Sequence, residues 1–155
     1  MPTKSIASIL IAEAAQIDPK QAADLLVSTN QEQAWLDAFA EQLDRQRNAE
    51  ALRRILSIWD LSQSDAARIF GVSRQAISKW FDTGVPADRA VSIADLGAAT
   101  DLLVRHLKRD RVPGVVRRPA SRLGNRSLVD LLMQQGFAEV LEACRAMFAF
   151  SEANH

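Results

Sequence analysis

Residues 62–81, which read SQSDAARIFGVSRQAISKWF, decide the fold. Ser62 is followed three residues later by Asp65, a capping-box pattern that predicts the start of a helix. Gly71 is expected to end that helix, because a tight turn into a second helix needs a left-handed backbone that glycine adopts at little cost. Ser73 is then placed to cap the second helix. The stretch therefore predicts a helix-turn-helix.

The apolar residues of this stretch recur where the two helices would face each other and the core. They are Ala66, Ala67, Ile69 and Phe70 on the first helix, Val72 in the turn, and Ile77 and Trp80 on the second helix. Small side chains suit a close helix crossing, and the larger ones follow the period of a helix. We expect these residues to be buried, which leaves the polar side chains facing outward.

The outward polar residues form a set that can bind DNA. Arg74 could pair with guanine and Gln75 with adenine, near the start of the second helix where base edges are normally reached. Ser78 lies on the same outward face, and the remaining polar groups are suited to hold phosphates. The candidate DNA-binding residues are Gln63, Ser73, Arg74, Gln75, Ser78 and Lys79. The alternative is a helical hairpin with a solvated polar face in a domain that does not bind DNA.

The composition predicts an all-α protein, a helical bundle that contains the helix-turn-helix and a small C-terminal helical module. The 155 residues include no tyrosine and few glycines, and strand-like alternation of apolar and polar residues is absent. The formal net charge is +0. Bulk electrostatic attraction therefore cannot hold nucleic acid, and DNA binding must come from a local patch.

Cysteine and histidine usage excludes several other classes. One cysteine, Cys144, cannot form an internal disulfide, and two histidines leave no ligand set for a structural zinc ion. Phosphate-binding glycine loops, nucleophile elbows and paired catalytic carboxylates are also missing. We therefore expect a cytoplasmic, nucleoid-associated protein that is not an enzyme, has no cofactor and no metal, and contacts no membrane.

Outside the helix-turn-helix, helix starts and apolar stripes extend in both directions. Starts are expected after Asp18 and within residues 29–32, and a break is favoured near Asn48, which could cap a further helix. The expected core positions before residue 62 are Ile6, Ile9, Leu10, Trp35, Phe39, Leu43, Leu52, Ile55, Leu56 and Trp59.

After residue 81, Gly84 is expected to stop the second helix and Pro86 to open a long helix that runs to about Lys108. Residues 112–114 would end that helix in a turn or hinge. A capping box begins a helix at Ser127, and Gly136 is expected to stop it. The expected core stripe of the last helix is Phe137, Val140, Leu141, Cys144, Met147 and Phe148.

A basic tract lies between residues 105 and 126, where Asp110 is the single acid. The tract consists of Arg105, Lys108, Arg109, Arg111, Arg117, Arg118, Arg122 and Arg126. It could extend the phosphate contacts, bind an acidic partner, or form a solvated surface.

Residues 118–132, which read RPASRLGNRSLVDLL, resemble the C-terminal region of the Xre/MbcA/ParS family of bacterial antitoxins. The resemblance covers about residues 51–150 and includes the position of the helix-turn-helix. Two positions depart from the family pattern: Val115 stands where an aromatic residue is common, and Leu128 where proline often starts the helix.

The resemblance implies two activities in one chain. The N-terminal part would bind operator DNA as a homodimer and repress its own operon, and the C-terminal part would neutralise a RES-domain toxin by covering its active site. The implied toxin-binding residues are Arg117, Arg118, Pro119, Leu123, Gly124 and Arg126. The alternative is a free-standing transcriptional regulator whose C-terminal part serves dimerisation or sensing. The corresponding domains are residues 1–48, of unknown role, residues 49–110, which bind DNA, and residues 111–155, which bind the toxin.

Overall fold

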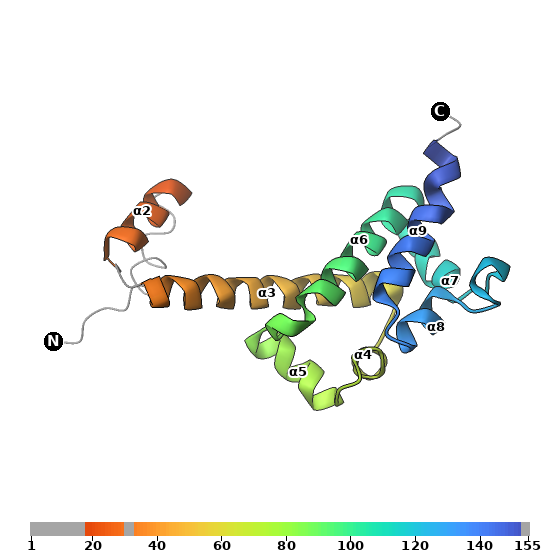
Figure 1. Cartoon of the computed structure of the whole chain (residues 1–155), viewed down its shortest axis with the longest axis horizontal. Helices are drawn as coiled ribbons and strands as arrows, with labels where there is room; N and C mark the ends of the chain where they lie inside the picture. Colours follow the sequence, from red (N-terminus) through yellow and green to blue (C-terminus); the bar gives the residue numbers. More distant parts are fainter. Residues whose placement is uncertain (1–17, 30–32, 153–155) are drawn as a thin grey trace. The chain divides into compact units, whose positions relative to one another are not determined.

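The computed structural model describes residues 18–29 and 33–152 (Figure 1). Across these ranges it contains helices and one isolated β-bridge, between Ala120 and Arg126, and no strands. The predicted all-α class is confirmed. No helix in the described ranges is both long and apolar enough to cross a membrane. The core positions expected at Ile6, Ile9 and Leu10 lie outside the described residues. Of the helix start expected within residues 29–32, Thr29 is the last residue of α2 and residues 30–32 lie outside the described ranges.

The chain divides into two compact units, Met1–Glu41 and Gln42–His155. In the first unit, α2 (Pro19–Thr29) begins where the sequence predicts. The Asp18 carboxylate accepts a hydrogen bond of 2.8 Å from the backbone N–H of Gln21, which caps the helix. The domain limits expected at residues 48 and 110 stay predictions.

Helix α3 (Gln33–Trp59) is continuous, so the expected break near Asn48 is wrong. Asn48 lies inside the helix and is half-buried. The residues around it are mainly alanine, leucine, glutamine, glutamate and arginine, which favour helix strongly enough to include one asparagine.

The two apolar stripes of α3 differ in burial. Leu52, Ile55, Leu56 and Trp59 are buried as expected, whereas Phe39 and Leu43 are 36% and 38% exposed. Trp35 is half-buried and stacks on Phe39, with ring centroids 5.3 Å apart. The prediction that this first stripe belongs to the core is wrong. Leu43 and Leu52 are about two and a half turns apart, so they lie on opposite sides of the helix.

The helix-turn-helix consists of α4 (Gln63–Phe70) and α5 (Arg74–Thr83). Gly84 ends α5 as expected, with a φ of 101°. Pro86 opens a short 3₁₀ turn, Ala87–Arg89, rather than the long helix itself. That helix, α6, runs from Ala90 to His106.

The segment after α6 differs from the prediction. A second 3₁₀ turn, Arg109–Arg111, leads into the short helix α7 (Val112–Val116). Residues 112–114 therefore begin a helix instead of forming a hinge. Pro113 is tolerated there because the first turn of a helix does not need its missing N–H.

The C-terminal part contains a 3₁₀ turn, Ser121–Leu123, followed by α8 (Leu128–Met133) and α9 (Phe137–Glu152). The capping box at Ser127 is confirmed. Gly136 was expected to stop α8, but Gln135 takes the left-handed conformation, with a φ of 60°. Gly136 instead allows a close approach, because a Cβ atom there would lie 3.0 Å from the carbonyl oxygen of Leu131.

Helices α6 and α9 pack side by side in the second unit (Figure 1). Buried residues from α3, α6 and α9 meet in one core. The stripe on α9 is buried except for Met147, which is 41% exposed. One polar contact crosses this core: the indole N–H of Trp59 donates to the Thr100 hydroxyl over 2.9 Å, and that hydroxyl donates to the Leu96 carbonyl over 2.7 Å.

The turn after α5 fits tightly against α3. The Val85 backbone N–H donates to the Arg45 carbonyl over 3.0 Å, and the Arg45 side-chain Nε donates back to the Val85 carbonyl over 3.2 Å. A Cβ atom on Gly84 would lie 2.8 Å from the Cβ of Arg45. Only a residue without a side chain fits between these two segments.

Replacing Gly84 by alanine should therefore lower the free energy of unfolding by about 2 to 4 kcal/mol, from the left-handed backbone and the clash together. Gly97 is the matched control, since it lies within α6 and a Cβ there meets nothing within 4 Å. Gly97→Ala should stabilise the protein by about 0.5 to 1 kcal/mol. Denaturant unfolding of both variants checks the pair, and equal midpoints would contradict the account of this turn.

Candidate nucleic-acid interface

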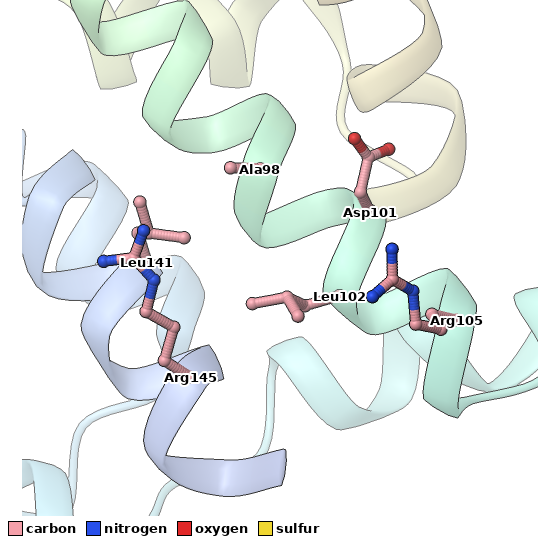
Figure 2. Close-up of a pocket in the computed structure, with 6 residues that line it drawn as sticks. All are labelled: Ala98, Asp101, Leu102, Arg105, Leu141 and Arg145. Atoms are coloured by element: carbon pink, nitrogen blue, oxygen red, sulfur yellow. The ribbon is translucent and has the colours of Figure 1, made fainter. Parts of the chain in front are cut away.

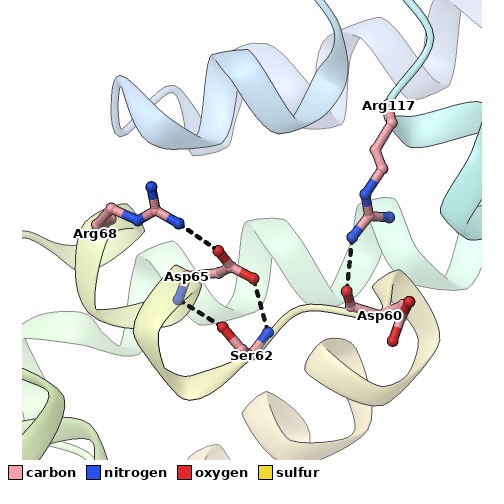
Figure 3. A network of polar contacts seen from close by, with 5 residues as sticks. All are labelled: Asp60, Ser62, Asp65, Arg68 and Arg117. Carbon is pink, nitrogen blue, oxygen red and sulfur yellow. Dashed lines mark hydrogen bonds and ion pairs between the residues drawn. The ribbon is translucent and has the colours of Figure 1, made fainter.

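Helix α4 begins with a reciprocal capping box (Figure 3). The Asp65 backbone N–H donates to the Ser62 hydroxyl over 3.1 Å, and the Ser62 backbone N–H donates to the Asp65 carboxylate over 2.9 Å. Arg68 pairs with the same carboxylate at 2.7 Å. The bond from the Ser62 backbone, with smaller help from the Ser62 hydroxyl and Arg68, lowers the pKa of Asp65 below its ordinary value. The start of α4 is thus fixed as predicted.

The turn between the two helices depends on Gly71, whose φ is 67°. The backbone N–H of Val72 donates to the Ala67 carbonyl over 3.0 Å, and that of Gly71 to the Arg68 carbonyl over 3.3 Å. A Cβ atom on Gly71 would lie 2.8 Å from the side-chain Nε2 of Gln135, between α8 and α9. The glycine therefore serves the left-handed turn, and the amide end of the Gln135 side chain lies against it.

Helix α5 is anchored on its inner side. Ile77 is fully buried and Trp80 is 6% exposed. The ring of Trp80 meets Phe70 edge-on at 5.5 Å, and Phe70 in turn stacks on Phe137 of α9 at 5.2 Å. Arg89 donates to the carbonyl of Phe70 over 3.1 Å. The apolar packing of Ile77 and Trp80 fixes which side of α5 faces outward.

The outward side of α5 carries the predicted polar set. Four of the six predicted residues line one depression of about 400 Å³, namely Gln63, Arg74, Gln75 and Ser78. All four are exposed, and so are Ser73 and Lys79, which lie outside the depression. Ser73 caps α5 by accepting a hydrogen bond of 3.0 Å from the Ala76 backbone N–H. The structure thus brings together residues from the starts of both helices.

The polar side chains that line this depression are available to bind a ligand. Within the described part of the chain, those of Gln63, Arg74, Gln75 and Ser78 form no hydrogen bond or ion pair, and the same holds for Lys79. The amides and the hydroxyl can each donate and accept, while the guanidinium offers a planar set of donors. Such groups match the donors and acceptors that base edges present in a major groove.

Arg117 has a role that the sequence did not reveal. Its guanidinium donates to the backbone carbonyls of Trp59 at 2.8 Å, Asp60 at 2.6 Å and Pro113 at 3.0 Å, and Figure 3 shows it reaching Asp60. Asp60 has a positive φ of 55°. Arg117 therefore caps the end of α3 just before α4 begins. The end of α3 also has a local cap, since the Leu61 backbone N–H donates to the Leu56 carbonyl over 2.9 Å, so no sequence signal called for Arg117.

The other residues predicted to bind a toxin divide into two groups. Gly124 and Arg126 shape their own loop: Gly124 has a φ of 65°, and Arg126 donates to the Leu123 carbonyl over 3.0 Å and to the Gln134 side chain over 2.9 Å. Arg118 and Pro119 are exposed, and Leu123 is half-buried against the core. This second group remains accessible to a partner.

A separate pocket of about 280 Å³ lies between α6 and α9 (Figure 2). Leu102 points into the space between the two helices, and Asp101 and Arg145 lie at its margins. Their charges are already paired, because Asp101 meets Arg54 at 2.9 Å and Arg145 meets Glu142 at 2.7 Å. Arg105 also lines the pocket, and within the described ranges its guanidinium forms no hydrogen bond or ion pair, so its charge is the one left unpaired there.

The one cysteine of the sequence, Cys144, packs in the core. Cys144 is fully buried in the core, and desolvation raises its pKa to about 12, so the thiol stays protonated near neutral pH. In the ranges that the structure describes, no group of three histidine, cysteine, aspartate or glutamate residues is placed to hold a metal ion.

Comparison with known proteins supports the fold. The chain matches no protein-family model, and no curated protein matches it significantly. Among solved structures, it resembles a chain of the crystal structure of the M. tuberculosis MbcT–MbcA toxin–antitoxin complex, with a TM-score of 0.51 and 22% sequence identity. The match covers 64% of this chain and 91% of that chain. At this identity the likeness concerns the fold.

Proposed function

We propose that this protein is the antitoxin of a type II toxin–antitoxin pair. Its helix-turn-helix binds operator DNA as a homodimer and represses its own operon in the cytoplasm, at the nucleoid. Its C-terminal module neutralises a RES-type toxin by covering the toxin's active site. In this role the protein is not an enzyme and needs no cofactor.

The observation that carries the proposal is that the outward polar side chains of α5 form no hydrogen bond or ion pair within the described part of the chain. Arg74, Gln75 and Ser78 line one depression with Gln63, while Ile77 and Trp80 hold the opposite side of α5 in the core. A rigid helix with free donors and acceptors near its N-terminus suits insertion into a major groove. Lys79, exposed beside this set, is suited to a phosphate.

Support for the toxin partner comes from two sources. Residues 118–132 carry the sequence resemblance to the antitoxin family, and the fold resembles that of a chain in a toxin–antitoxin complex. The exposed Arg118 and Pro119 and the half-buried Leu123 offer polar and apolar groups to such a partner.

A second candidate function is a free-standing transcriptional regulator. The specific observation in its favour is that Phe137 and Gln135, from the C-terminal part, pack against the helix-turn-helix at Phe70 and Gly71. On this view the C-terminal helices brace the DNA-binding domain and bind no toxin.

The DNA-binding proposal is tested by titrating single variants against the DNA upstream of the protein's own gene. Arg74→Ala and Gln75→Ala should each weaken binding by about 1 to 3 kcal/mol and relax the choice of base, because each removes a contact to a base edge. Lys79→Ala should weaken binding to all sequences similarly, because it removes a phosphate contact. Unchanged affinity in all three variants would refute the assignment of this surface.

The antitoxin proposal is tested by co-expressing the full chain with the product of the neighbouring gene. If that product is a RES-type toxin, we expect growth to be restored and the two proteins to purify together. A C-terminal truncation is unsuitable as a control, because Leu128, Leu132 and Val140 belong to the core. A neighbour that neither associates with the chain nor arrests growth would favour the free-standing regulator.

A further inference from the structure

The arginines of the basic tract differ in whether their guanidinium groups form hydrogen bonds within the protein. Arg109 donates to the Ser57 hydroxyl over 3.1 Å, and Arg117 and Arg126 bond to backbone carbonyls. By contrast, the guanidinium groups of Arg111 and Arg118 form no hydrogen bond or ion pair with any residue in the described ranges. Both side chains are exposed. Their charges are available to a ligand.

These two arginines line the same hollow, which we name the α7 depression. It has a volume of about 420 Å³ and is lined by Leu107, Asp110, Arg111, Gly114, Val115 and Arg118. A Cβ atom on Gly114 would meet nothing within 4 Å, so there is open space beside this residue. Leu107 and Val115 are half-buried and provide apolar walls.

The charges and the walls together specify a kind of ligand. Two guanidinium groups against the one carboxylate of Asp110 leave a net positive charge, which attracts an anion. Arginine pairs with a carboxylate through two parallel hydrogen bonds, and Leu107 and Val115 can cover an adjoining aliphatic chain. Asp110 repels either anion, so the two arginines must outweigh it in both cases. The apolar walls make the difference, because a phosphate backbone would gain nothing from them.

We infer that the α7 depression receives an aspartate or glutamate side chain of the protein partner, held by Arg111 and Arg118. This inference rests on the proposed function, because the partner is the toxin. It extends the contact surface beyond the residues that the family resemblance implied, since Arg111, Gly114 and Val115 precede the segment 117–126. It also gives a role to two residues of the basic tract, Arg111 and Arg118, whose side chains form no hydrogen bond or ion pair within the described ranges.

The test reverses charge in full-length protein co-purified with the product of the neighbouring gene. The double variant Arg111→Glu and Arg118→Glu should weaken binding to that protein by about 30-fold or more, because attraction becomes repulsion. The matched control is Arg105→Glu with Lys108→Glu, which changes the net charge equally at exposed positions outside the depression. The control should change the affinity by less than about threefold, because it acts only through screened, long-range charge.

A second variant fills the depression without changing any charge. A Cβ atom on Gly114 meets nothing within 4 Å, so we expect Gly114→Phe to fold, and the thermal melting curve verifies this. We expect partner binding to fall by about tenfold, since the ring occupies the position of the incoming side chain. Unaltered binding by a folded Gly114→Phe protein would overturn the inference.

The same proteins distinguish the remaining outcomes. If both charge-reversal pairs weaken partner binding equally, the inference fails while the proposed function stands. If the Arg111 and Arg118 pair instead loses affinity for the upstream DNA and keeps its partner, the depression is a phosphate site and the inference is wrong. If the unmodified chain does not bind the neighbouring gene product at all, the proposed toxin partnership fails, and the inference with it.

Discussion

The second unit of the protein depends on the C-terminal end of α3. There the indole of Trp59 is fully buried and bonds to Thr100 of α6, while the Trp59 carbonyl accepts a hydrogen bond from Arg117 after α7. Asp60, in a left-handed conformation, then turns the chain toward Ser62 and α4. The end of α3 is thus held by Thr100 and by Arg117, which lie far along the chain. Because α4 begins directly after this end, those contacts also determine the position of the helix-turn-helix.

This arrangement makes the proposed DNA-binding surface and the C-terminal module parts of one folded body. Phe70 of α4 stacks on Phe137 of α9, and Gln135 lies against Gly71 in the turn of the helix-turn-helix. The helices of the C-terminal module bury residues in the same core as α3 and α6. The two proposed activities therefore use separate exposed surfaces on a shared scaffold, and neither can be isolated by cutting the chain between them.

Local signals made much of this fold predictable. The capping boxes at Ser62 and Ser127 and the glycine at residue 71 specify helix ends through near neighbours, and the structure confirms all three. Features that depend on residues distant in the sequence could not be predicted. Periodicity identifies the apolar stripe at Phe39 and Leu43, but it does not show whether another element covers that stripe. For the same reason, the sequence does not predict that Arg117 caps α3, because the carbonyls of Trp59 and Asp60 lie nearly sixty residues earlier.

The central claim is that α5 presents its outward side chains to DNA, while Arg111 and Arg118 of the α7 depression bind another partner. Amide chemical shifts of the isotope-labelled full chain, followed while the upstream DNA is added, test this most directly. We expect the largest changes at Gln63 and residues 73–79, with residues 111–118 nearly unmoved. Large changes at residues 111–118 with none at residues 73–79 would contradict the account.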